Sequence, residues 1–122
     1  MILIGVNKAI DAEKAVVFVK SIADINKTPS GSLVALDFKE SDLEFYASVD
    51  IAIAVKVNNI RDFILLASAK AKYALADLPL AAKLQKLADR YLFDIKVLAI
   101  APSSKIEKIA KLGIDGIFAL SA

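Results

Sequence analysis

Short apolar runs alternate with helical patterns along this chain, and after the first run they begin roughly 20 residues apart. Such spacing is typical of compact strand–helix units, in which parallel strands are buried on both faces by the rest of the domain. The pattern predicts one α/β domain over residues 1–122. Six strands are expected, at Ile2–Val6, Leu33–Phe38, Ile51–Val57, Tyr73–Ala76, Lys96–Ala101 and Gly116–Leu120.

Two arrangements of these units fit the pattern. The first is a three-layer α/β/α sandwich with a mostly parallel sheet of about five to six strands. The alternative is a partial βα barrel completed by dimerisation. The phrase from Ala110 to Phe118 is similar to one found in βα barrels, although six strands are two fewer than a closed eight-stranded barrel needs.

Several helix boundaries carry local signals. Ser41 and Ser104 each begin a sequence that fits a capping box, with Glu44 and Glu107 at the third following position. The other expected signals are Asn58 or Asn59 and Asp77 as amino-terminal caps, Pro79 in a first turn, a stripe of Leu80, Leu84, Leu87, Tyr91 and Leu92, and Gly113 as a left-handed carboxyl-terminal cap.

The segment around Val16–Val19 allows two interpretations. Its β-branched run suits a strand. A 3.6-residue period nevertheless places Ala12, Ala15, Val16, Val19, Ile22 and Ala23 on one face, so we favour a first helix there.

Composition narrows the functional classes. The chain has neither Cys nor His, which removes the usual ligands of structural zinc sites and the Ser-His and Cys-His catalytic pairs. We therefore expect no metal and no cofactor, and we favour a non-catalytic protein over an enzyme. The missing Cys also fits a reducing cytoplasm, and neither a signal peptide nor a membrane span is expected.

Charge and apolar content bear on partners. Arg61 and Arg90 are the only arginines among 16 basic residues, and the lysines are interleaved with acidic residues, so nucleic-acid binding is not favoured. The apolar fraction of 57% is high for a small domain and predicts a homo-oligomer, most simply a dimer. A last strand without a following helix predicts a two-fold contact through an edge at Gly116–Leu120.

Candidate site residues follow from the rule that ligands gather at the carboxyl ends of parallel strands. Asp37, Lys56 and Asp77 end or follow apolar strands, and together they would form a carboxylate–ammonium–carboxylate cluster. The alternative is structural: each Asp caps a helix or accepts loop amides, and Lys56 pairs with one of them. Weaker ligand-binding candidates at the same strand ends are Asn7, Lys8, Lys39, Asn58, Ser103 and Ser104.

Three functional hypotheses result. The first is a non-catalytic module that binds a small anionic ligand at the strand ends or acts as a protein-interaction domain. The second is a lyase-like or proton-transfer enzyme that uses Lys56 with Asp37 or Asp77. The third rests on Asp50–Val57, which resembles the central strand of restriction-endonuclease-like domains but has Ala54 where that family carries a metal-binding Glu. That resemblance implies an inactive, nucleic-acid-associated relative.

Overall fold

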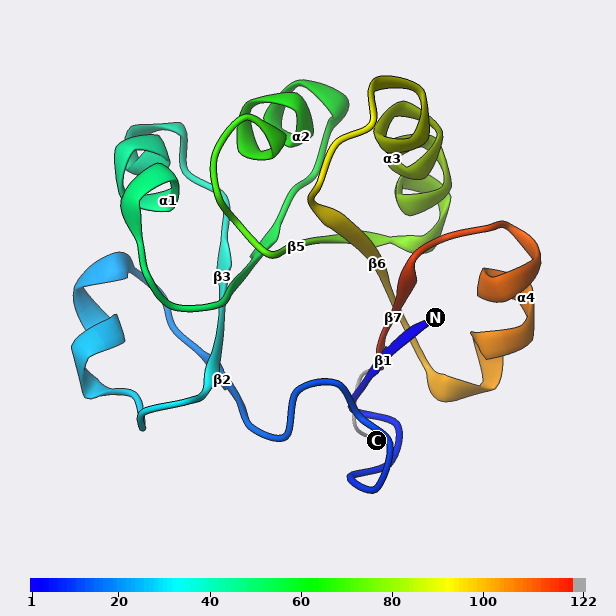
Figure 1. The fold of residues 1–122 in the computed structure, drawn as a ribbon, viewed down its shortest axis with the longest axis horizontal. Coiled ribbons are helices and arrows are strands. Elements are labelled where there is room, and N and C mark those ends of the chain that lie inside the picture. The colour runs from blue at the N-terminus through cyan, green and yellow to red at the C-terminus, as the bar shows by residue number, and fades with distance from the viewer. Residues whose placement is uncertain (120–122) are drawn as a thin grey trace.

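A computed structural model describes residues 1–119 of the chain. It contains seven strands, four α-helices and three short 3₁₀ helices (Figure 1). The strands are β1 (Ile2–Ile4), β2 (Val16–Phe18), β3 (Leu33–Asp37), β4 (Ile53–Lys56), β5 (Tyr73–Asp77), β6 (Lys96–Ala101) and β7 (Gly116–Ala119). The helices are η1 (Ile22–Lys27), η2 (Glu40–Asp42), α1 (Leu43–Ser48), α2 (Ile60–Ala67), α3 (Leu78–Tyr91), η3 (Ser103–Lys105) and α4 (Ile106–Lys111).

All seven strands form one parallel sheet in the order β1-β7-β6-β5-β4-β3-β2. The α/β class and the parallel sheet are thus confirmed, with seven strands in place of five or six. All six expected strands are present within one or two residues of their predicted ends, apart from Leu120, which lies outside the described residues.

The sheet is curled, and the α-helices lie on its outer side (Figure 1). Two separate cores follow from this curl. The larger core joins sheet and helices and includes Tyr46, Phe63 and Leu84. The smaller core contains only strand residues, namely Ile4, Leu33, Ala35, Ala54, Tyr73, Leu75, Leu98 and Phe118. The sheet therefore packs its inner face against itself, and the molecule has the form of the partial βα barrel.

The expected first helix is wrong. Val16–Phe18 is strand β2, which pairs in parallel with Leu33–Ala35 of β3, and the helix that follows is a 3₁₀ turn at Ile22–Lys27. Val16 packs against the inner core. As a strand, this β-branched run forms backbone hydrogen bonds with the edge of β3. A helix at this position could not form them.

The expected edge position of the last strand is also wrong. β7 lies between β1 and β6, with Gly116 opposite both Ile2 and Leu98. A Cβ at Gly116 would overlap the Ile2 carbonyl oxygen and approach the Leu98 Cδ2 to 2.8 Å. The absence of a side chain at Gly116 allows β1, β7 and β6 to pack closely at this point. The predicted two-fold contact through Gly116–Leu120 assumed that this strand lies at an edge of the sheet, and it does not.

The two edges of the sheet are β1 and β2, which follow each other in the chain. Residues 5–15 connect them and return from the carboxyl end of β1 to the amino end of β2 (Figure 1). This seam loop is held to β1 by a hydrogen bond from the Ala12 amide to the Leu3 carbonyl, at 2.8 Å. The Asp11 carboxylate inside the loop accepts the amides of Gly5, Val6 and Asn7 at 3.0 to 3.2 Å.

Helix boundaries were predicted with mixed success. Asn59 caps α2 as expected, accepting the Asp62 amide at 2.8 Å, and Gly113 follows α4 with a φ of 73°. Both capping boxes are wrong. Ser41 and Ser104 lie within 3₁₀ turns, and neither α1 nor α4 has a side-chain cap. These turns wind the backbone before the α-helix begins, so the serines are not in the extended conformation that a cap requires.

Helix α3 lies on β5 and β6, as its amphipathic pattern predicts, with Leu84 fully buried. Its predicted stripe extends too far. Tyr91 and Leu92 are exposed, and the helix ends at Tyr91, followed by Leu92 in a left-handed conformation with a φ of 56°. Within residues 1–119 no helix combines the length and apolar character that a membrane crossing requires.

Candidate functional site

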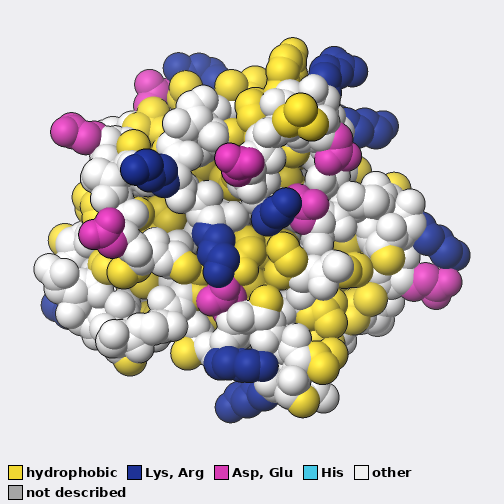
Figure 2. All heavy atoms as spheres, in the orientation of Figure 1, with side chains coloured by type: hydrophobic (Ala, Val, Ile, Leu, Met, Phe, Trp, Pro, Cys, Tyr) yellow, Lys and Arg dark blue, Asp and Glu magenta, His cyan; other side chains and the backbone are white. Residues whose placement is uncertain are grey.

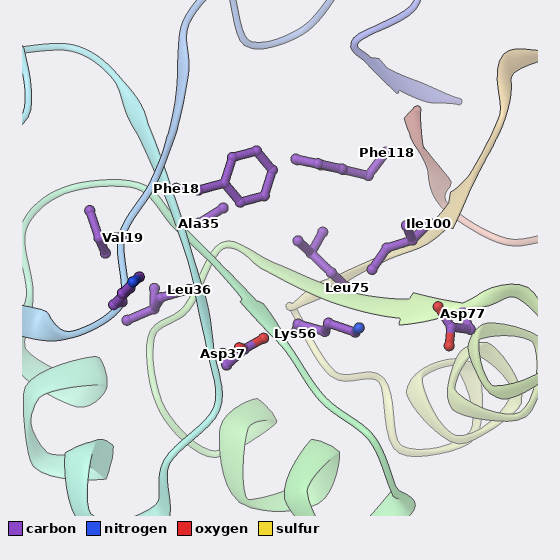
Figure 3. Close-up of a pocket in the computed structure, with 11 residues that line it drawn as sticks. Phe18, Val19, Ala35, Leu36, Asp37, Lys56, Leu75, Asp77, Ile100 and Phe118 are labelled. Carbon is purple, nitrogen blue, oxygen red and sulfur yellow. The ribbon is translucent and has the colours of Figure 1, made fainter. Parts of the chain in front are cut away.

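The carboxyl ends of the strands surround a cavity of about 490 Å³ (Figure 3). This volume falls within the range of small-molecule sites. The cavity collects side chains from β2 through β7, and the sheet curl brings them together from distant parts of the sequence. Its lining consists of Phe18, Val19, Lys20, Ala35, Leu36, Asp37, Lys56, Leu75, Asp77, Ile100 and Phe118.

All three principal candidates line this cavity. Asp37 and Lys56 are register partners at the ends of β3 and β4, and Asp77 ends β5 on the other side of β4. In Figure 3 the Lys56 side chain lies between the two carboxylates. The rule that parallel strands present their carboxyl ends at one edge is enough to explain this convergence.

Lys56 is half-buried and has no polar partner in the described part of the chain, residues 1–119. No carboxylate oxygen in residues 1–119 lies within 4.0 Å of its ammonium, and the ammonium donates no hydrogen bond to any of these residues. The four ion pairs present in this part of the chain all lie elsewhere, as in Arg61–Glu40 at 2.6 Å. An ammonium held at an apolar cavity without a counter-ion is an available binding group.

The two carboxylates are equally available. Asp77 occupies the amino-terminal cap position of α3, yet its side chain makes no capping hydrogen bond. Asp37 is exposed, and its carboxylate accepts no hydrogen bond from residues 1–119. Neither aspartate therefore has the capping or loop-binding role of the structural alternative, and both side chains face the cavity instead (Figure 3).

Tyr46 of α1 holds the carboxyl end of β3 in place. This fully buried residue of α1 accepts the Lys39 amide at 3.2 Å through its hydroxyl, which also lies 3.5 Å from the Asp37 carbonyl oxygen. Burial is the main cause that raises the pKa of Tyr46 above its ordinary value. The hydroxyl thus holds the backbone on both sides of Phe38 and helps to fix the position of Asp37 at the end of β3.

The apolar part of the cavity is formed by Leu75, Ile100 and two phenylalanines. Phe18 of β2 meets Phe118 of β7 edge to face, with ring centroids 5.7 Å apart and an interplanar angle of 87°. Phe118 is buried, whereas Phe18 is 68% exposed. The pair spans the open side of the curl at the cavity and gives it an aromatic wall.

The opposite end of the inner core is closed. The Tyr73 hydroxyl donates to the Glu13 carboxylate at 2.8 Å, and the Lys72 ammonium lies 2.8 Å from the same oxygen. Burial, followed by the hydrogen bond to Glu13, raises the pKa of Tyr73, and Glu13 likewise raises the pKa of Lys72. The seam loop thus contacts the buried Tyr73 at the amino end, whereas the cavity lies at the carboxyl end.

The weaker candidates do not line the cavity. Asn7 and Lys8 lie in the seam loop, where the Asn7 side chain accepts the Ala9 amide at 2.9 Å. Ser103 and Ser104 form η3, while Lys39 and Asn58 are exposed beyond the ends of β3 and β4. The strand-end rule places residues at this edge of the sheet but does not say which side chains line the cavity.

Lys20, Phe18 and Phe118 are cavity residues that the sequence reasoning missed. Lys20 and Phe18 were assigned to the first helix, and treating Val16–Val19 as a strand would have placed both at its carboxyl end. Phe118 was assigned to a strand correctly, but the period-2 alternation within β7 gives no sign of which face is inner.

The endonuclease-like phrase Asp50–Val57 does not bring its polar residues together in the structure. Asp50 of the endonuclease-like phrase precedes β4, whereas Lys56 ends it, so the two lie at opposite ends of the strand. Within residues 1–119, acidic residues form no group of three or more that could hold a metal ion. On the face shown in Figure 2, basic and acidic side chains are interleaved around exposed apolar ones.

This arrangement offers a small molecule two ammonium groups, two carboxylates and an apolar wall. Comparisons with protein-family models, with curated proteins and with solved structures found no match to the chain. The case for function therefore stands on the geometry of the cavity.

Proposed function

We propose that the protein binds a small organic carboxylate in the cavity at the carboxyl ends of its strands. The observation that carries this proposal is the Lys56 ammonium, which borders an apolar-walled cavity and has no ion-pair partner among residues 1–119. A carboxylate on Lys56 would supply the missing counter-ion. The organic part of the ligand would then contact Leu75, Ile100 and Phe118.

Isothermal titration calorimetry tests the proposal with short aliphatic and aromatic carboxylates, each with and without a 2-amino, 2-hydroxy or 2-oxo group. We expect at least one of them to bind. Lys56→Met keeps most of the apolar stem but removes the charge, and it should weaken that binding by about tenfold to a hundredfold. Lys83→Met changes an exposed lysine of α3 and should leave binding unchanged.

If no carboxylate binds at millimolar concentration, or if both lysine variants bind as the unmodified protein does, the proposal is wrong. The calorimetric stoichiometry adds a second check, because one cavity per chain predicts one ligand per chain.

A second candidate function is carbonyl chemistry at Lys56, favoured by the two carboxylates that flank it. The Lys56 nitrogen would form a bond to the carbonyl carbon of a 2-oxo acid, and the carbonyl oxygen would leave as water. Asp37 or Asp77 would take up the proton that the ammonium must lose first. Borohydride would reduce the resulting imine and fix the 2-oxo acid covalently on Lys56, which peptide mass spectrometry detects. Absence of this adduct, together with reversible binding, leaves the binding function alone.

A further inference from the structure

The cavity carries charges of both signs in equal number. Lys20 and Lys56 contribute two positive charges, and Asp37 and Asp77 contribute two negative ones. None of the four side chains is engaged in an ion pair or hydrogen bond with residues 1–119. Asp37 and Asp77 are exposed and therefore hydrated, but both would repel a ligand that carried only negative charge.

Asp77 shows most clearly that these carboxylates are not structural. Aspartate at an amino-terminal cap position normally accepts amides of the first helical turn, and losing that bond costs stability. In α3 the capping bond is not made, and the carboxylate lines the cavity. The position thus forgoes a local stabilising contact while presenting an acceptor to the cavity.

From this balance we infer that the ligand is a zwitterion, an α-amino acid with an aliphatic or aromatic side chain. The inference rests on the proposed function, because it adds a second charge to the ligand already proposed. The ligand carboxylate pairs with Lys56, and its ammonium pairs with Asp37 or Asp77 on the neighbouring strands. The side chain packs against Leu75, Ile100 and Phe118, and the overall charge of cavity and ligand stays at zero.

Three probes with the same branched aliphatic side chain separate the two charges. L-leucine carries both, 4-methylpentanoate lacks the ammonium, and 3-methylbutylamine lacks the carboxylate. We expect L-leucine to bind about tenfold to a hundredfold more tightly than either single-charge analogue, since each analogue leaves a charged cavity group without its partner. L-phenylalanine and 3-phenylpropanoate repeat the comparison with an aromatic side chain.

The double variant Asp37→Asn/Asp77→Asn tests the role of the carboxylates. It should bind L-leucine no more tightly than 4-methylpentanoate, while its affinity for 4-methylpentanoate should not fall, because two repelling charges are gone. Asp50→Asn is the matched control, since Asp50 is exposed before β4 at the other end of that strand. It should retain the full preference for L-leucine.

The outcomes separate this inference from the proposed function. If the unmodified protein binds 4-methylpentanoate as tightly as L-leucine, the zwitterion is wrong while carboxylate binding stands. Equal binding of 3-methylbutylamine and L-leucine overturns the role of Lys56. If neither amino acid nor either carboxylate binds, both the inference and the proposed function fail.

Discussion

The ring of Phe18 stands edge-on against the ring of Phe118, although β2 and β7 are not neighbours in the sheet. The hydrogen-bonded ladder breaks between β1 and β2, and this aromatic pair spans the break at the cavity. Side-chain packing thus completes, on the inner face, a closure that backbone pairing leaves open.

Replacing Phe18 tests this closure. Phe18→Ala should lower the free energy of unfolding by about 1 to 2 kcal/mol, because it removes the aromatic pair and uncovers Phe118. Phe18→Leu retains apolar bulk and should recover part of the loss. Urea denaturation followed by circular dichroism measures both. An unchanged unfolding midpoint for Phe18→Ala would show that the contact contributes nothing to closure.

Gly116 is predicted to be the most size-sensitive position of the sheet. Gly116→Ala should destabilise the protein by about 3 kcal/mol or more, because the new Cβ overlaps the Ile2 carbonyl oxygen, a backbone atom held in the sheet. Gly31→Ala separates this crowding from backbone strain. Gly31 has a φ of 85° with no atom near its missing Cβ, so its substitution should cost only about 1 kcal/mol. If thermal unfolding shows that Gly116→Ala and Gly31→Ala lose the same amount of stability, crowding at Gly116 is ruled out as the cause.

The seam loop should make the protein acid-sensitive through Asp11. Burial raises the pKa of this carboxyl, but the three amides it accepts and the charge of Lys14 outweigh that effect and hold the pKa below its ordinary value of 3.8. A lowered native pKa gives stability that is present above pH 3.8 and is lost as the pH falls through the native value.

Asp11→Asn should therefore lose stability near neutral pH, by about 1 kcal/mol, and show a shallower loss below pH 4. Urea midpoints measured between pH 3 and pH 7 give both quantities. Asp50→Asn, which removes an exposed carboxylate, should keep the acid dependence of the unmodified protein. If the slope below pH 4 is the same in Asp11→Asn as in the unmodified protein, Asp11 is not its source.

Tyr46 links stability at high pH to the position of Asp37. Its native pKa is raised above the ordinary value of 10.0, so its contribution is fully present below pH 10 and is lost as the pH rises through the native value. Tyr46→Phe should lower stability by about 1 kcal/mol near pH 7 and make the decline above pH 10 less steep. The part that remains comes from Tyr73 and Lys72, whose pKa values are also raised. If stability declines above pH 10 as steeply in Tyr46→Phe as in the unmodified protein, Tyr46 is not a source of that decline.

Much of the fold could be predicted because buried parallel strands have continuous apolar sequences. The runs at Leu33–Leu36 and Val97–Ala101 are apolar on both faces, and this marks them as buried strands. The curl of the sheet could not be predicted for the same reason. A run that is apolar on both faces does not indicate which face packs against helices and which against the inner core. β2 was missed because three residues are too few for a period to distinguish strand from helix.

The candidate site was predicted in part for a related reason. Asp37, Lys56 and Asp77 are polar residues that end apolar strands, so strand ends alone placed them at one edge. Their shared cavity also depends on the curl, on the unused cap at Asp77, and on the packing of Phe18 across the seam. These are long-range features, and local sequence signals do not encode them.

The most direct measurement of the central claim is the rate at which each lysine is acylated, with and without ligand, read by peptide mass spectrometry. If the cavity is the binding site, saturating L-leucine or 4-methylpentanoate should slow acylation of Lys56 roughly in proportion to 1 + [L]/Kd, while the exposed Lys83 keeps its rate. Acylation of Lys56 at one rate throughout, under conditions where calorimetry shows the ligand bound, would place the binding site elsewhere and contradict the account.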